Sequence, residues 1–249
     1  MVNFHIITLF PESFESYLSA SIVKRAISDQ KISVKYYNPR DYTKAKKGKV
    51  MTYSDRRVDD RPYGGGPGMV IEAMPIIRAI DAAVGTKLRR TKKGERRKEN
   101  EGLGIRNKKN SGAKTKVKIL FFSPSGVQFT NTLAEKYKEY TDIVLVCGRY
   151  EGIDARVKKA FPMTDVSVGP FVITGGELAA MIVLDAISRR IPGVLGHNLS
   201  IEEDRVASPD VYTRPEVIEF KGKKLKVPKV LLGGNHADIE EWKLKRIKN

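Results

Sequence analysis

Two runs of apolar, mostly β-branched residues, each ending in a glycine turn that carries polar side chains, most constrain the fold of this 249-residue chain. The first run leads into the turn Gly148–Gly152, and the second leads into the turn Thr174–Glu177. Such runs are typical of strands buried inside an α/β sheet, and ligands bind such sheets at the ends of their strands. Because the two turns are close in sequence, we expect one pocket built from adjacent loops.

The same alternation of strands and helices continues through the rest of the chain. A mainly parallel sheet with helices on both faces is therefore expected. The apolar patterns predict strands at 4–10, 32–37, 117–122, 143–147 and 166–173, and helices near 11–26, 72–84, 133–140 and 176–191. A turn is expected at 123–126, directly after the third of these strands. After residue 214 they predict a short hairpin around 221–224 and a basic helix containing Ile239 and Trp242.

The chain is strongly basic, with 46 Lys and Arg against 29 Asp and Glu, a formal net charge of +17. Such a charge favours a polyanionic partner, and nucleic acid is the leading candidate. The alternative is a solvated, lysine-rich surface, because the charge is unevenly placed. Residues 86–118 hold 14 basic and 3 acidic residues, which is +11 of the total.

Residues 86–116 interrupt the pattern of strands and helices. The segment has no aromatic residue and few apolar ones, so it cannot offset the entropy of becoming ordered. We interpret it as a disordered basic insertion. It is either an arm that grips an RNA backbone or a solvated loop without a specific partner.

The remaining composition excludes several classes of protein. No apolar run approaches the ~20 residues that cross a bilayer, and the N-terminus reads as a first strand instead of a signal peptide. A single cysteine, Cys147, fits a reducing cytoplasm. The three histidines, His5, His197 and His236, are scattered without ligand spacing, so no structural metal site is expected.

A glycine-rich loop at 64–68 follows Asp59–Tyr63, which supplies acidic, basic and aromatic side chains. It resembles a phosphate-binding loop but lacks the lysine and hydroxyl of a Walker A motif, so an enzyme of that class is a weak alternative. We interpret it as a loop whose backbone closely approaches a planar ligand or a nucleotide. The alternative is a surface turn that binds nothing.

Six motifs together resemble the bacterial tRNA (guanine-N1)-methyltransferases of the TrmD type, which belong to the SPOUT superfamily. The motifs occur in the order of that family and cover most of the chain outside 86–116. They are D-D-R-P-Y-G-G-G-P-G-M (59–69), L-V-C-G-R-Y-E-G-I-D (145–154), T-G-G-E-L (174–178), S-R-R-I-P-G-V-L-G (188–196), Y-T-R-P-E (212–216) and G-N-H-A (234–237).

The resemblance implies a methyltransferase domain at 1–196 with a deep trefoil knot at about 117–196, which is a rare topology. It also implies a linker at 197–213 that carries a catalytic acid, and a shortened segment at 214–249 that contacts tRNA. The enzyme would be a cytoplasmic homodimer whose site is made from both subunits.

The resemblance further implies S-adenosylmethionine as the cofactor, bound among the loops of the knot. Its tRNA substrate would lie against the glycine-rich loop, and Glu151 is a possible nearby carboxylate for the Mg²⁺ that the family is associated with. The matching cofactor positions are Pro124, Gly148, Tyr150, Gly152, Val168, Gly169, Pro170, Phe171, Val172, Ile173, Gly175 and Gly176. The matching substrate positions are Asp60, Gly64, Gly65, Gly66, Gly68 and Glu151.

Asp204 matches the general base of the family, and Arg189 matches its companion arginine. Methylation of guanine N1 at tRNA position 37 would need such a pair, because N1 carries a proton and is a poor nucleophile until a base removes it. A cation would then balance the charge that develops on O6. The alternative is a non-catalytic RNA-binding relative of the same fold.

Overall fold

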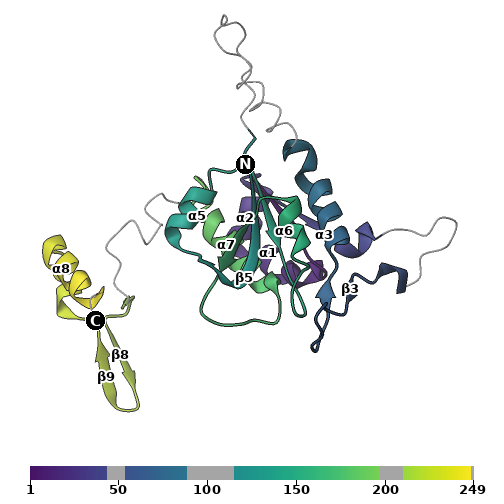
Figure 1. The fold of residues 1–249 in the computed structure, drawn as a ribbon. Helices are drawn as coiled ribbons and strands as arrows, with labels where there is room; N and C mark the ends of the chain where they lie inside the picture. The colour runs from purple at the N-terminus through teal and green to yellow at the C-terminus, as the bar shows by residue number, and fades with distance from the viewer. Residues whose placement is uncertain (44–53, 89–114, 197–209, 248–249) are drawn as a thin grey trace, which may run out of the picture. The chain divides into compact units, whose positions relative to one another are not determined.

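The computed structural model describes residues 1–43, 54–88, 115–196 and 210–247 (Figure 1). The chain divides into two compact units, Met1–Val194 and Leu195–Asn249. The predictions for Asp204 and for most of the basic insertion therefore concern residues outside these ranges.

The first unit is built on a five-stranded sheet in which every pair of neighbouring strands is parallel. The strand order is β2-β1-β6-β5-β7. This confirms the predicted α/β architecture with a parallel sheet. The strands are β1 (Val2–Ile7), β2 (Ile32–Tyr37), β5 (Val117–Gln128), β6 (Asp142–Val146) and β7 (Thr164–Ser167).

Helices cover both faces of this sheet, because alternate residues of each buried strand point to opposite sides (Figure 1). Leu145 of β6 belongs to one core, and Val144 and Val146 belong to the other. The first core is completed by η1 (Pro11–Phe14), α1 (Glu15–Leu18), α2 (Ser21–Ser28), α5 (Asn131–Tyr137) and α7 (Gly176–Ser188). The second is completed by α3 (Ala73–Ile80) and α6 (Arg156–Ala160).

Two of the predicted helices differ from the structure. The helix expected near 11–26 is divided into η1, α1 and α2, and Ser21, with φ of 50°, begins the last of them. The apolar residues keep their spacing across the two interruptions, so all three segments face the same core. The helix expected at 72–84 changes from α3 to a π-helical turn, Asp81–Gly85, and residues 86–88 remain helical.

The structure also corrects the strands near the two glycine turns. β5 is longer than expected and contains the predicted turn 123–126, where its register against β7 shifts. β7 ends at Ser167, so 168–173 is a loop instead of the predicted strand. The Ser167 hydroxyl donates to the carbonyl of Gly169 at 2.9 Å, which turns the chain away from the sheet.

Several short elements have too few residues for a periodic signal. They include β3 (Asp59–Asp60), which leads into the glycine-rich loop where no strand was expected, and its antiparallel partner β4 (Val70–Ile71). The others are η2 (Pro39–Tyr42) and η3 (Ser54–Arg56).

The second unit contains the predicted hairpin and basic helix. The hairpin pairs β8 (Val217–Phe220) with β9 (Lys223–Lys226), and both residues of its turn, Lys221 and Gly222, have positive φ. A short η7 (Lys229–Leu231) then leads to α8 (His236–Ile247). None of the helices in the described ranges combines the length and apolar character needed to cross a membrane.

A buried polar cluster lies at the amino end of β6. The Asp142 carboxylate, in a residue that is 1% exposed, accepts hydrogen bonds from His5, Lys87 and Thr141. Burial alone would raise the pKa of Asp142, but these hydrogen bonds lower it to about 2. His5 also lies 3.2 Å from the Tyr37 hydroxyl. These side-chain contacts connect strands β1, β2 and β6 with one another and with Lys87.

Candidate ligand-binding site

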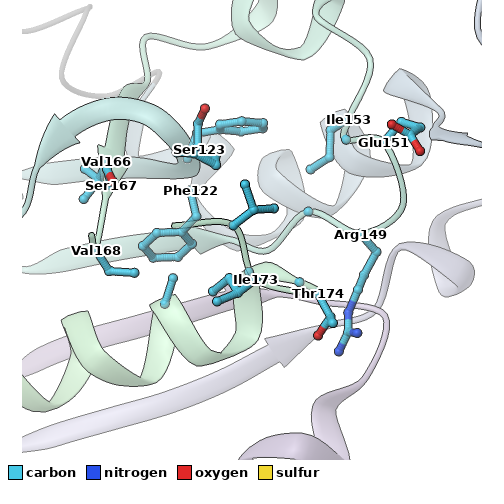
Figure 2. Close-up of a pocket in the computed structure, with 18 of the residues that line it drawn as sticks. Phe122, Ser123, Arg149, Glu151, Ile153, Val166, Ser167, Val168, Ile173 and Thr174 are labelled. Atoms are coloured by element: carbon cyan, nitrogen blue, oxygen red, sulfur yellow. The ribbon is translucent and has the colours of Figure 1, made fainter. Parts of the chain in front are cut away.

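A cavity of about 450 Å³ opens at the carboxyl ends of β6 and β7 and beside residues 121–124 of β5 (Figure 2). Its size lies in the range of small-molecule and cofactor sites. Parallel sheets bind ligands at this edge, so the position agrees with the pocket expected from the two glycine turns.

One wall of the cavity is apolar. Figure 2 shows the side chains of Phe122, Val168 and Ile173 gathered around the same space. Phe122 comes from β5, whereas Val168 and Ile173 come from the loop between β7 and α7. Such a surface suits the flat or aliphatic part of a ligand.

Three segments form the remaining walls: residues 121–124 of β5, the loop after β6 at 148–153, and the turn at 174–176 that begins α7. These segments approach one another closely. The amide of Gly176 donates to the carbonyl of Gly148 at 2.9 Å, which joins the loop after β6 to the start of α7. A Cβ atom on Gly176 would lie 2.7 Å from the Cα of Cys147, and one on Gly126 would lie 2.5 Å from the amide nitrogen of Val166. Glycine is required at both positions because larger residues would meet backbone atoms.

The structure brings nearly all of the predicted cofactor residues to this cavity. Pro170 is the exception, and its neighbours Gly169 and Phe171 both line the wall. Tyr150 also lines it, with φ of 59° in the turn after β6. Binding of a cofactor by these residues stays a prediction. The predicted residues at the cavity are Pro124, Gly148, Tyr150, Gly152, Val168, Gly169, Phe171, Val172, Ile173, Gly175 and Gly176.

The predicted substrate residues are only partly brought together. Glu151 lies at the cavity wall, and a Cβ atom on Gly68 would come within 2.5 Å of its carboxylate. The amide of Glu151 donates to the carbonyl of Met69 at 3.0 Å, so the end of the glycine-rich loop is fixed beside the cavity. Gly64, Gly65 and Gly66 are exposed, and a Cβ atom on any of them would meet nothing within 4 Å. Asp60 is exposed on β3.

Arg189 lies at the opposite end of α7 from the cavity. The helix begins at Gly176 in the cavity wall, and 13 residues later, at about 1.5 Å per residue, Arg189 is roughly 20 Å further along. A Cβ atom on Gly193 would lie 3.3 Å from the Lys31 side chain, which places the end of α7 beside the amino end of β2. The structure therefore does not bring Arg189 to the cavity of the same chain.

A stripe on α7 connects the cavity to Arg189. Its Leu178 and Ile182 are 55% and 49% exposed, and the partly buried Asp185 and Arg189 continue the same face at helical spacing. The Tyr17 hydroxyl hydrogen-bonds to Asp185, and burial together with this carboxylate raises the pKa of Tyr17 to about 12. Paired exposed apolar residues on such a face are typical of a protein contact surface.

Sequence reasoning missed a polar network beneath the cavity. Glu177, which is 2% exposed, accepts a hydrogen bond from the Thr8 hydroxyl at 2.8 Å, and its other oxygen lies 2.9 Å from Nε of Arg149. The second contact is an ion pair whose angles do not suit a hydrogen bond. The guanidinium of Arg149 lies 4.6 Å from the centre of the Phe10 ring. Thr8 directly follows β1, so polar residues at strand ends were the available signal.

The other titratable groups include a buried thiol. Cys147 is fully buried, and this burial raises the pKa of its thiol well above the usual value, so it has little thiolate character. Within the ranges that the structure describes, no three His, Cys, Asp or Glu side chains gather as metal ligands.

The fold is that of an α/β protein with a cavity of cofactor size at the carboxyl edge of a parallel sheet. The sequence model of the family described as tRNA (Guanine-1)-methyltransferase TrmD matches residues 2–99 and 103–249. The chain belongs to this family.

Curated relatives agree with this assignment. A tRNA (guanine-N(1)-)-methyltransferase from Caldanaerobacter subterraneus subsp. tengcongensis is 41% identical, with 96% of this chain and 84% of that protein covered. Proteins of the same name from Shewanella amazonensis and Pseudoalteromonas atlantica are 40% and 37% identical. These alignments cover 97% and 98% of this chain and 83% and 79% of the two relatives.

Proposed function

We propose that this protein transfers a methyl group from S-adenosylmethionine to N1 of guanine 37 in tRNA, next to the anticodon. The observation that carries the proposal is the cavity itself. Its three loops hold the positions that match the cofactor residues of the family to which the chain belongs.

The cavity fits the chemistry of S-adenosylmethionine. Phe122 and Ile173 offer apolar surface to an adenine ring, and the glycines of the two turns leave backbone amides and carbonyls accessible to its polar edge. Tyr150 adds an aromatic side chain that is 51% exposed. When bound there, the cofactor would supply an electrophilic methyl group on sulfonium sulfur.

The residues of this chain would then activate guanine. We assign Asp204 as the base that removes the proton from N1, which makes the nitrogen nucleophilic toward the methyl group. Arg189 would stabilise the negative charge that develops on O6. General base catalysis contributes about 10²–10⁴-fold, and fixed charge at a developing oxyanion contributes a similar amount or more.

A homodimer would bring Arg189 to a cavity that it cannot reach in its own chain. If the stripes of two α7 helices pack antiparallel about a two-fold axis, the Arg189 end of one helix lies near the Gly176 end of the other. Leu178 and Ile182 would be buried at that contact. We propose that the linker carrying Asp204 likewise reaches the cavity of the partner protomer.

The polypeptide path and the tRNA contacts complete the proposal. We propose a deep trefoil knot within 117–196, which would hold the three loops of the cavity together. We assign tRNA contact to 214–249, where the hairpin carries Lys221, Lys223, Lys224 and Lys226 around an exposed Phe220. Aromatic and cationic side chains in this combination bind single-stranded RNA.

The basic insertion at 86–116 would add affinity for the RNA backbone through its charge. For Mg²⁺, the described residues offer Glu151 at the cavity wall but no group of three ligands.

Methyl transfer to matched tRNA transcripts tests the proposal. We expect label from methyl-labelled S-adenosylmethionine to enter a transcript with G at position 37 and not an identical transcript with A there, because the base acts on the N1 proton that adenine lacks. The measurement is acid-precipitated label over time.

Binding of the G transcript without transfer of label would contradict the enzymatic assignment and support the non-catalytic RNA-binding alternative. Equal labelling of both transcripts would contradict the assignment of N1 of guanine as the target.

A further inference from the structure

We infer that Glu177 is a positioning residue of the cofactor site. It acts through Thr8 and Arg149 to keep the two glycine turns in fixed positions relative to each other. The inference rests on the proposed function for the identity of the cofactor. Its structural basis lies in residues that were not assigned to the site.

Glu177 is held in a buried position that is costly for a carboxylate. The residue is 2% exposed, and charges are buried in proteins only when paired and hydrogen-bonded. Its location in the first turn of α7 provides partial compensation, because the amino end of a helix favours negative charge. Replacement of such a pair by well-packed apolar residues is often neutral or stabilising, so fold stability alone does not account for the charges.

The hydroxyl of Thr8 has a fixed orientation. It donates to Glu177 at 2.8 Å and accepts from the amide of Phe10 at 3.0 Å, and Thr8 itself is completely buried. One oxygen of the carboxylate is thereby tied to the segment that follows β1.

Arg149 connects the same carboxylate to the turn after β6. Figure 2 shows its side chain running toward Thr174, with Phe122 and Val168 on the other side of the view. The guanidinium of Arg149 lies 2.9 Å from Glu177 and over the ring of Phe10. A Cβ atom on Gly175 would lie 2.3 Å from Nε of Arg149, so the arginine fills the space against the second glycine turn.

The network therefore joins three segments around one carboxylate. Two of them contribute cavity walls through Gly148–Gly152 and through Gly175 and Gly176, and the third, Thr8–Phe10, lies outside the cavity. Loss of the network would shift the walls relative to each other. A cofactor that is bound by backbone amides and carbonyls would then bind to the protein more weakly. The chemical step, which depends on Asp204, would be much less affected.

The experiment measures the Kd of S-adenosylmethionine by calorimetry, kcat at saturating cofactor, and thermal stability. Thr8→Val removes the hydroxyl with little change in shape, and we expect it to raise the Kd by about tenfold or more with kcat changed less than about twofold. Thr8→Ser restores the hydroxyl and should restore the Kd. Arg149→Lys keeps the positive charge but loses the planar guanidinium group, so it should also raise the Kd.

Glu135→Gln is the matched control, because Glu135 pairs with the buried Arg190 away from the cavity. It should leave the Kd unchanged even if the melting temperature falls. An unchanged Kd in both Thr8→Val and Arg149→Lys would overturn the inference, as would a Thr8→Ser variant as weak as Thr8→Val. Failure of the unaltered protein to bind S-adenosylmethionine would instead overturn the proposed function.

Discussion

Replacement of Asp204 by Asn is expected to lower kcat for methyl transfer by about 10²–10⁴-fold, because asparagine cannot accept the N1 proton of guanine. The Kd for S-adenosylmethionine should remain unchanged, since the cavity residues are retained. Single-turnover methylation of a G37 transcript measures the first quantity, and calorimetric titration of the cofactor measures the second.

Glu202→Gln provides the control for Asp204, because it removes an acid from the same linker without removing the proposed base. It should retain kcat within a few-fold. Wild-type turnover in the Asp204→Asn variant, or an equal loss in both variants, would contradict the assignment of Asp204 as the base.

Asp142→Ala is expected to lower the free energy of unfolding by about 3–5 kcal/mol, because it leaves buried polar partners without their acceptor. Urea denaturation at neutral pH measures this change. Asp165→Ala is the matched control: Asp165 forms an ion pair with Lys158 in which both side chains are more than a third exposed, so a loss of about 0–1 kcal/mol is expected.

The same cluster has a predictable pH dependence. The pKa of Asp142 is lowered to about 2 in the folded protein. The contribution of its carboxylate to the free energy of unfolding is therefore fully present above about pH 4 and is lost as pH falls through about 2. The difference in stability between wild type and Asp142→Ala should shrink over that interval. An Asp142→Ala variant no less stable than Asp165→Ala at neutral pH would contradict the role given to this cluster.

Periodic apolar patterns were sufficient to predict the sheet and most of its helices. Strand β6 is buried on both faces, and its residues 143–146 form a continuous apolar run. Short elements such as β3 could not be predicted, since two residues carry no period. The extent of β5 was also missed, because its residues 123–126 read as a turn and the structure places them within a strand whose register shifts.

The cavity could be anticipated from the sequence, whereas the network beneath it could not. Gly148 and Gly176 stand out as strand-end glycines, and the structure joins them by a hydrogen bond of 2.9 Å. Polar residues at strand ends mark Thr8 as a candidate, but its contact with Glu177 spans 169 positions and no local pattern pairs the two residues. The position of Arg189 at the far end of α7 likewise depends on how the helix lies on the sheet, which the motif does not specify.

Mixing of two inactive variants tests most directly whether the cavity of one protomer works with the Asp204 of its partner. Gly148→Phe is the cavity variant, because a Cβ atom there meets only the side chain of Ile153, at 3.7 Å, and a large side chain would occupy cofactor space. Asp204→Ala is the other. After unfolding and refolding together, mixed dimers should regain methyl transfer through the one site that combines an intact cavity with an intact carboxylate. Mixed dimers that form but remain as inactive as either variant alone would contradict a site shared between protomers.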